Sequence, residues 1–222
     1  MSDTDSFIDE VTEEVRRDRL FLMFKRYGWI GAVAVVAIVG GAAWREYSQA
    51  QERAAAQAVG DAMTAALASN EADARAAALA KVSAETVGAQ AVVDMARAAA
   101  LADAGQADEA AKVLDKIASD GALPQVYRDI AAFKSVILQA GTLAPEERRL
   151  RLETLAAPGA TLQFLAGEQL ALLDIEQGKT EAALTRLRDI AASAGVSRDL
   201  QERVSQVIVA LGGSEDSAEQ EG

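Results

Sequence analysis

Two stretches of the chain align without a gap, GQADEAAKVLDKIAS at 105–119 and GKTEAALTRLRDIAA at 178–192. The coinciding positions are a glycine, two alanines and an aliphatic pair, namely Gly105, Ala110, Leu114, Ile117 and Ala118 in the first stretch and Gly178, Ala183, Leu187, Ile190 and Ala191 in the second. Glycine permits a tight turn between two helices, alanine lets the helices approach closely, and leucine and isoleucine fill the seam. These residues therefore predict helical hairpins that pack on one another.

The offset between the two stretches, 73 residues, is about twice 36. Gly141, followed after a two-residue shift by Leu152, Leu155 and Ala156, marks a third copy between them. The repeating unit is therefore roughly 36 residues, close to the 34 of a tetratricopeptide repeat.

Helices are expected on both sides of each glycine. Their ranges are 89–104, 124–140 and 160–177 before the glycines, 108–119, 145–156 and 180–193 after them, and 197–211 as a closing helix. The polar face Gln201-Glu202-Arg203 would cap the array towards solvent. Abundant alanine and only three prolines support an all-α fold, a tetratricopeptide-like helical-hairpin solenoid.

Residues 27–44 carry no charge and predict a single transmembrane helix upstream of the repeats. Eighteen helical residues rise roughly 27 Å, close to the hydrocarbon thickness of a bilayer. Aromatic residues at both ends match the interfacial belts of membrane proteins. The residues expected to anchor the segment are Tyr27, Trp29, Ile30, Val33, Val36, Ile38, Val39 and Trp44.

The distribution of cations predicts the orientation of this segment. Arg16, Arg17, Arg19, Lys25 and Arg26 precede it, whereas only Arg45 and Arg53 follow within a comparable distance. The N-terminus is therefore expected in the cytoplasm and the C-terminal domain on the opposite, exported side of the membrane. The alternative is a cleaved signal peptide, for which Gly41-Ala42-Ala43 offers small residues.

The expected organisation has five parts. They are a cytoplasmic amphipathic arm (1–26), the transmembrane helix (27–44), a stalk with a leading helical hairpin (45–87), the degenerate repeats (88–212) and a disordered acidic tail (213–222). The stalk is expected to run to about Ala68, and a second helix from Glu71 to Val82 is expected to follow a cap at Asn70.

Composition argues against catalysis and against several classes of ligand. The chain has no cysteine and no histidine, so it lacks the commonest general base and the commonest transition-metal ligands. Its net charge of −12 disfavours binding to nucleic acid. We expect no enzymatic activity, no cofactor and no metal.

Two further groups of residues have alternative interpretations. Arg148, Arg149 and Arg151 lie near Glu146, Glu147 and Glu153 and are expected to form intrahelical ion pairs, with a partner-binding patch as the alternative. Tyr127, Phe133 and Phe164 are expected in the core, although a concave repeat surface could expose one of them as an anchor for a partner.

The chain resembles the bacterial inner-membrane tetratricopeptide-like family typified by the ancillary subunit of the SecYEG translocon. The resemblance is carried by the arm at 7–18, the entry Phe24-Lys25-Arg26-Tyr27-Gly28-Trp29, the exit Trp44-Arg45, the stretch 155–159 and the helix from Ala166 through Gly178. It implies a single-span protein whose repeat domain faces the periplasm, associates with the translocon and with periplasmic chaperones, and assists newly exported proteins. The repeats lack the large aromatic positions and most of the prolines of a standard tetratricopeptide.

The expected function is therefore a membrane-anchored, protein-binding scaffold with the lipid bilayer, translocon subunits, a periplasmic chaperone and exported clients as partners. The rival within the binding class is a periplasmic adaptor or coordinator of cell division or envelope assembly, released by cleavage.

Overall fold

The computed structural model describes the backbone of residues 3–213, and the side chains of residues 25–213 apart from positions 28 and 32. All regular secondary structure in this range is helical. The helices are α1 (Asp3–Leu67), α2 (Ala72–Leu79), α3 (Val87–Asp103), α4 (Ala107–Ser119), α5 (Gln125–Leu138), α6 (Pro145–Leu155), α7 (Gln163–Glu176), α8 (Thr180–Ala192) and α9 (Arg198–Ala210). The chain forms two units, Met1–Ala55 and Ala56–Gly222, which are described separately.

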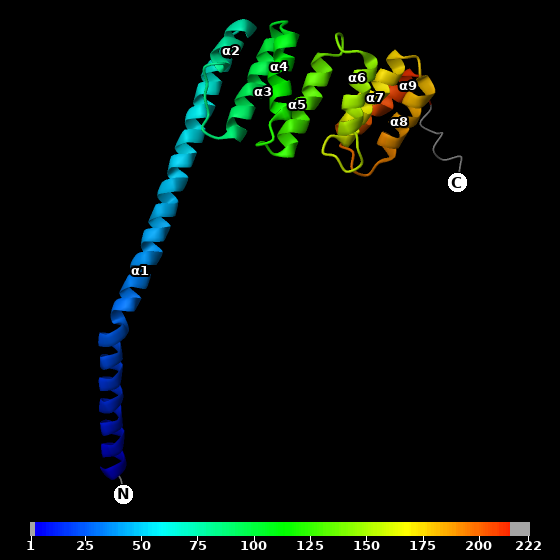
Figure 1. The fold of residues 1–222 in the computed structure, drawn as a ribbon. Helices are drawn as coiled ribbons and strands as arrows, with labels where there is room; N and C mark the ends of the chain where they lie inside the picture. Colours follow the sequence, from blue (N-terminus) through cyan, green and yellow to red (C-terminus); the bar gives the residue numbers. More distant parts are fainter. Residues whose placement is uncertain (1–2, 214–222) are drawn as a thin grey trace, which may run out of the picture. The chain divides into compact units, whose positions relative to one another are not determined.

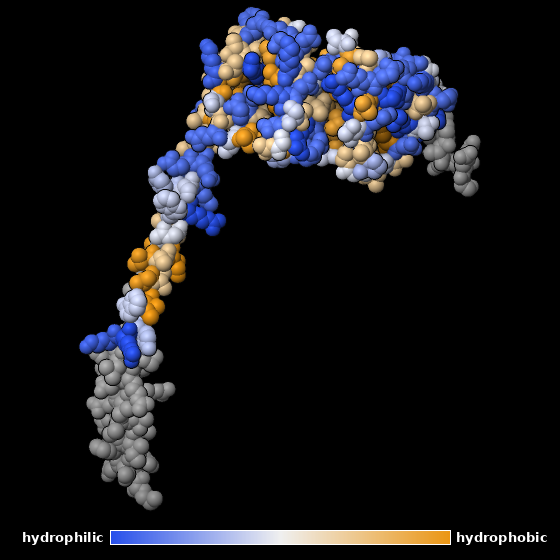
Figure 2. All heavy atoms as spheres, in the orientation of Figure 1, coloured by the Kyte–Doolittle hydropathy of each residue, from blue (hydrophilic) through white to orange (hydrophobic). Residues whose placement is uncertain are grey.

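The first unit consists of most of α1, which contains a segment long and apolar enough to cross a membrane. No other helix in the described part of the chain meets these criteria of length and composition. Figure 2 shows this segment as an apolar band on α1. Val36 and Ile38 are 71% and 72% exposed, and their neighbours Val35 and Val39 are exposed as well. Because these four side chains point in different directions around the helix, a single apolar partner face would not cover them all.

The expected membrane anchors are all exposed on α1. Tyr47 packs near Trp44, with ring centroids 6.5 Å apart, at the C-terminal end of the apolar band. At the other end the Arg26 guanidinium lies 5.9 Å from the centre of the Tyr27 ring. The side chains of Arg16, Arg17 and Arg19 and those of the predicted amphipathic arm up to residue 24 lie outside the described residues, as does the predicted tail from residue 214 onward.

The second unit is a series of helices in which each helix from α2 onward packs against the next one in the chain, and α3 also contacts α5 (Figure 1). Three apolar clusters fill it. The first joins the end of α1 to α2, α3, α4 and α5, the second joins α7, α8 and α9, and the third lies between α5, α6 and α7. The helices expected from the sequence are present, with ends that differ by a few residues. The predicted cap of α2 is wrong, because Glu71 is the N-cap residue and makes no side-chain capping hydrogen bond.

The two aligned stretches form equivalent structures. Gly105 and Gly178 end α3 and α7 with φ angles of 76° and 73°, a left-handed conformation that favours glycine. The N–H groups of Gln106 and Lys179 each donate to a carbonyl five residues back, at 2.9 and 2.8 Å, so both helices end in a Schellman motif. The following helices bury the matching residues Ala110, Leu114 and Ile117 and Ala183, Leu187 and Ile190.

The equivalence extends beyond these stretches. Moving α2 to α5 forward by 73 positions superimposes them on α6 to α9 respectively, with ends that differ by up to three residues, and we call these two sets of helices the first copy and the second copy. Core positions coincide across the offset. Examples are Leu79 with Leu152, Val93 with Ala166, Ala98 with Ala171 and Ala131 with Val204, all of them buried. The structural repeat is therefore a 73-residue unit of four helices.

The expected third copy at Gly141 differs from the other two in its turn. Gly141 has no positive φ, and residues 139–144 make a longer connection than the turns at Gly105 and Gly178. Leu152 and Leu155 are buried in α6 as expected, but the buried residue that precedes them at the same spacing as Ala110 and Ala183 is Arg148. An arginine therefore replaces the small alanine where the glycine turn is absent.

Arg148 joins three helices. Its guanidinium donates to the carbonyl oxygen of Ala140 just after α5, at 3.1 Å, and to both carboxylate oxygens of Glu176 at the end of α7, at 2.8 and 3.2 Å. The residue 73 positions earlier repeats this arrangement. Arg75 donates to the carbonyls of Ser69 and Asn70 after α1 and to Asp103 at the end of α3. The 73-residue unit therefore contains two kinds of helix connection, a glycine turn and an arginine bridge.

The arginine cluster of α6 corrects the expectation of intrahelical pairs. Only Arg151 behaves as expected, pairing with Glu147 at 2.6 Å. Arg148 and Arg149 instead reach α7, where Arg149 binds the buried Asp174 at 2.6 Å. Although the charged residues of α6 are spaced for pairing along this helix, two of its arginines bind acids of α7 and so connect the two helices.

The three residues of the expected polar cap on α9, Gln201, Glu202 and Arg203, are all exposed, but Arg203 has a second role. Arg203 turns towards the buried Glu168 of α7 and binds both of its carboxylate oxygens, at 2.6 and 2.7 Å. The hydrogen bond to Glu168 raises the pKa of the Arg203 guanidinium despite its partial desolvation. The guanidinium of Arg203 therefore stays charged at physiological pH.

Candidate protein-binding groove

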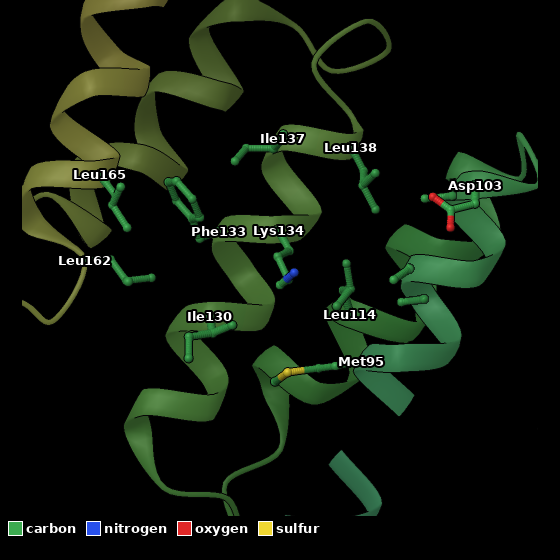
Figure 3. Close-up of a pocket in the computed structure, with 13 residues that line it drawn as sticks. Met95, Asp103, Leu114, Ile130, Phe133, Lys134, Ile137, Leu138, Leu162 and Leu165 are labelled. Atoms are coloured by element: carbon green, nitrogen blue, oxygen red, sulfur yellow. The ribbon is translucent and has the colours of Figure 1, made fainter. Parts of the chain in front are cut away.

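A pocket of about 550 Å³ opens between the first helices of the successive hairpins (Figure 3). Its walls come mainly from α3 and α5, and α7 closes one side with the residues Leu162 and Leu165. The other lining residues are Met95, Ala98, Ala99, Ala102 and Asp103 of α3, Leu114 of α4, and Ile130, Phe133, Lys134, Ile137 and Leu138 of α5. Eleven of these thirteen side chains are apolar, so we refer to the pocket as the groove.

The sequence of α5 explains why this helix can line a groove and also contribute to the core. Ala131, Ser135 and Val136 are buried against neighbouring helices. A second stripe, Val126, Ile130, Phe133 and Ile137, recurs at intervals of three and four residues and so lies along another face of the helix. Ile137 is 41% exposed, which is unusual for an isoleucine in a folded domain. The second stripe is the signal by which the sequence could have revealed the groove.

Of the three aromatic residues considered from the sequence, only Phe133 lines the groove. Tyr127 packs against the first apolar cluster and Phe164 against the second. Phe133 is partly buried and also packs against the third cluster, so all three aromatic residues contact the core as expected, and Phe133 alone of them also faces the groove.

Comparison of the two copies shows which residues leave the groove open. Ala99 and Ala102 of α3 correspond to Leu172 and Ile175 of α7. In the second copy Ile175 packs against the core cluster, together with Val207 of α9. The first copy thus has methyl groups where the second copy has large aliphatic side chains. The groove arises from these small residues in α3.

The two copies also differ in where their charged residues lie. Met95 and Ile130, which face each other across the groove in the first copy, correspond to Glu168 and Arg203, the paired charges of the second copy. Lys134 corresponds to Val207. The groove is therefore apolar where the second copy has an ion pair, and it carries a cation where the second copy is apolar.

The predicted repeat residues of the first copy belong to the core that underlies the groove. Leu114 lines its floor, and Ala110 and Ile117 lie in the same core cluster as Leu114. Gly178, Ala183, Leu187 and Ile190 belong to the second copy and are absent from the lining. Sequence reasoning identified the packing that builds the groove and two of its lining residues, Leu114 and Phe133, and missed the others.

Comparison of the chain with protein-family models, curated proteins and solved structures gives no significant match.

The electrostatics of the arginine bridge lead to a prediction about pH. A hydrogen bond from Arg148 lowers the pKa of the Glu176 carboxyl, against an opposing effect of desolvation. A carboxyl whose pKa is lower in the folded state stabilises the fold above its unfolded pKa of about 4.3, and this stabilisation is lost as the pH falls through the folded pKa. Because Glu176 is 52% exposed, we expect its contribution to be only about 0.5 kcal/mol.

Glu176→Gln should therefore be slightly less stable than the parent protein at pH 7, and the difference should shrink as the pH falls below about 4. Urea unfolding followed by circular dichroism across this pH range measures it. Glu153→Gln, at an exposed position of α6, is the matched control and should show no such pH-dependent difference. A constant difference between parent and Glu176→Gln at all pH values would contradict this linkage.

Proposed function

We propose that this protein is a membrane-anchored scaffold that binds other proteins through the groove between α3 and α5. The hairpin array is proposed to be a tetratricopeptide-like solenoid in the periplasm, and the excess of cations before the apolar segment of α1 supports this orientation. Following the family resemblance, its partners are subunits of the Sec translocon and a periplasmic chaperone, and its role is to assist newly exported proteins. The single observation that carries the binding role is the open apolar groove.

The argument from the groove is energetic. Each side chain such as Ile137 or Phe133 that a partner covers contributes roughly 25 cal/mol for each Å² of apolar surface removed from water. Exposed apolar surface of this kind on a folded domain typically marks a site of interaction. The second copy shows that larger side chains are compatible with the same helix packing. The open groove is therefore a feature of the first copy and is not imposed by the fold.

The membrane anchor complements this role. A scaffold that meets exported chains needs a high local concentration at the membrane, and tethering supplies it without any new contact surface. The apolar band of α1 is exposed all round and is flanked by aromatic residues. Bilayer lipid can cover such a helix on every side.

Site-specific photo-crosslinking in intact membranes tests the proposal. A photo-reactive amino acid at Ala99 or Ile137 places the probe in the groove, and one at exposed Lys112 on α4 serves as the matched control. The membranes are washed with carbonate before irradiation, so that protein released by signal cleavage is removed. We expect translocon or chaperone subunits at the groove positions and not at Lys112.

Two outcomes would contradict the proposal. Loss of the protein in the carbonate wash would support the cleaved periplasmic adaptor. Retention of the protein without any crosslink from the groove to export machinery would show that the scaffold does not act at the translocon.

A further inference from the structure

The second copy has large side chains at two positions where the first copy has alanine, and their chemistry indicates what the groove binds. In the second copy Leu172 and Ile175, three residues apart, occupy the positions that Ala99 and Ala102 leave small in the first copy. Ile175 packs against the second cluster, and a partner that supplies aliphatic side chains at a similar spacing would provide apolar contacts of this kind in the first copy. Such spacing is that of one face of a helix.

Lys134 adds a charge to this apolar surface. None of the ion pairs among the described residues involves Lys134. The only acid that lines the groove, Asp103, is already bound by Arg75 at 3.1 Å. Lys134 therefore remains an unneutralised cation in the groove of a chain whose net charge is −12. A carboxylate of a partner would complement it.

The extent of the apolar surface distinguishes a protein segment from a small ligand. Beyond the groove, α3 exposes Val92 and α5 exposes Val126, both continuing the apolar faces that line it. From Val126 to Ile137 the stripe covers eleven residue steps of helix, or roughly 16 Å. Val126 and Ile137 at its two ends are exposed and the residues between them are partly buried, whereas sites for small ligands bury most of the ligand surface. A segment of protein can cover such an open strip.

We propose that the groove binds a protein segment that presents aliphatic side chains on one face together with a carboxylate, and that Lys134 is the residue that selects the carboxylate. This proposal rests on the scaffold function and specifies the class of partner segment. Ala99 and Ala102 provide the space, and Lys134 provides the charge preference.

Peptide binding to the full chain in amphipol tests the proposal. The probes are fluorescein-labelled, alanine-based peptides of about 15 residues, a length at which helix is marginally stable in water. They carry leucines spaced three residues apart, and a single position beside the leucines is Glu, Gln or Lys. We expect the Glu peptide to bind about threefold to fivefold more tightly than the Gln peptide, as for a partly exposed ion pair, and the Lys peptide to bind most weakly.

Lys134→Glu should reverse this order, because the same groove then favours the Lys peptide. Lys116→Glu, at an exposed position of α4 outside the groove, is the matched control and should leave the order unchanged. Ala99→Leu combined with Ala102→Ile, which copies the residues of the second copy, should remove binding of all three peptides. Lys134 is exposed, so its replacement tests the proposal even if the filled variant folds poorly.

The outcomes separate this proposal from the scaffold function. An order of binding that Lys134→Glu leaves unchanged would overturn the selection of a carboxylate. Sodium palmitate that binds in the groove while the Glu peptide does not would overturn it in favour of a lipid. If the membrane crosslinks form but the peptides show no preference, the scaffold function stands and only this proposal fails.

Discussion

Arg203→Ile should lower the free energy of unfolding by about 3 kcal/mol, although Arg203 lies on the last described helix and is half exposed. The reason lies in its partner. Glu168 is only 5% exposed, and both of its carboxylate oxygens accept hydrogen bonds from Arg203. Removing the guanidinium leaves a buried carboxylate without compensation, which is far more costly than losing a surface ion pair. Urea unfolding in a mild detergent, followed by circular dichroism, measures the loss.

The first copy supplies the compensating change. Its equivalents of Glu168 and Arg203 are Met95 and Ile130, which pack as apolar residues in the same helix geometry. The double variant Glu168→Met, Arg203→Ile should therefore recover stability to within about 1 kcal/mol of the parent protein or exceed it, since apolar replacement of a buried pair is often neutral or stabilising.

Arg198→Ile is the matched control, because Arg198 pairs with Glu202 on the exposed surface of the same helix. It should cost less than about 0.5 kcal/mol. If Arg203→Ile were as mild as this control, the pair with Glu168 would be a surface contact and the account of buried charge would be wrong.

The sequence predicted the helices well because they depend on local signals. Glycine before a helix, aliphatic residues three and four apart and the absence of proline within helices are visible in the chain itself. Leu114 and Leu187 could be assigned to the core without a structure because each repeats at a fixed distance along the chain. A repeating pattern specifies which face of a helix is buried.

The partners of the charged residues could not be predicted in the same way. Arg148, Arg149 and Arg203 have acids nearby in sequence, yet each binds an acid on α7, 25 to 35 residues away. Their choice depends on how the helices pack, which charge spacing within one helix does not encode. The groove was missed for a related reason, because Ala99 and Ala102 become informative only when they are aligned with Leu172 and Ile175.

Arg148→Ala is expected to destabilise the fold by about 2 to 3 kcal/mol, even though alanine is the native residue at the corresponding position of α4 and α8. The two glycine turns explain the difference. At Gly105 and Gly178 the carbonyls at the end of the helix accept backbone hydrogen bonds within the Schellman motif, so no side chain is needed there. Residues 139–144 form no such turn, and Arg148 supplies the donor to the carbonyl of Ala140.

Removing Arg148 therefore has two consequences that add. The Ala140 carbonyl loses its donor, and a side chain that is only 10% exposed leaves a space between α5, α6 and α7.

Arg148→Lys should rescue little, because an ammonium group cannot reproduce the planar geometry that binds a carbonyl and both oxygens of Glu176 together.

Arg151 on the same helix provides the matched control for this prediction. It is 36% exposed, and its short contact is to Glu147 one turn away, so Arg151→Ala should cost less than about 0.5 kcal/mol. Equal effects of Arg148→Ala and Arg151→Ala on urea unfolding would mean that the arginine bridge does not replace the glycine turn. A large effect at Arg148 alone would show that the 73-residue unit closes its two hairpin connections by two different means.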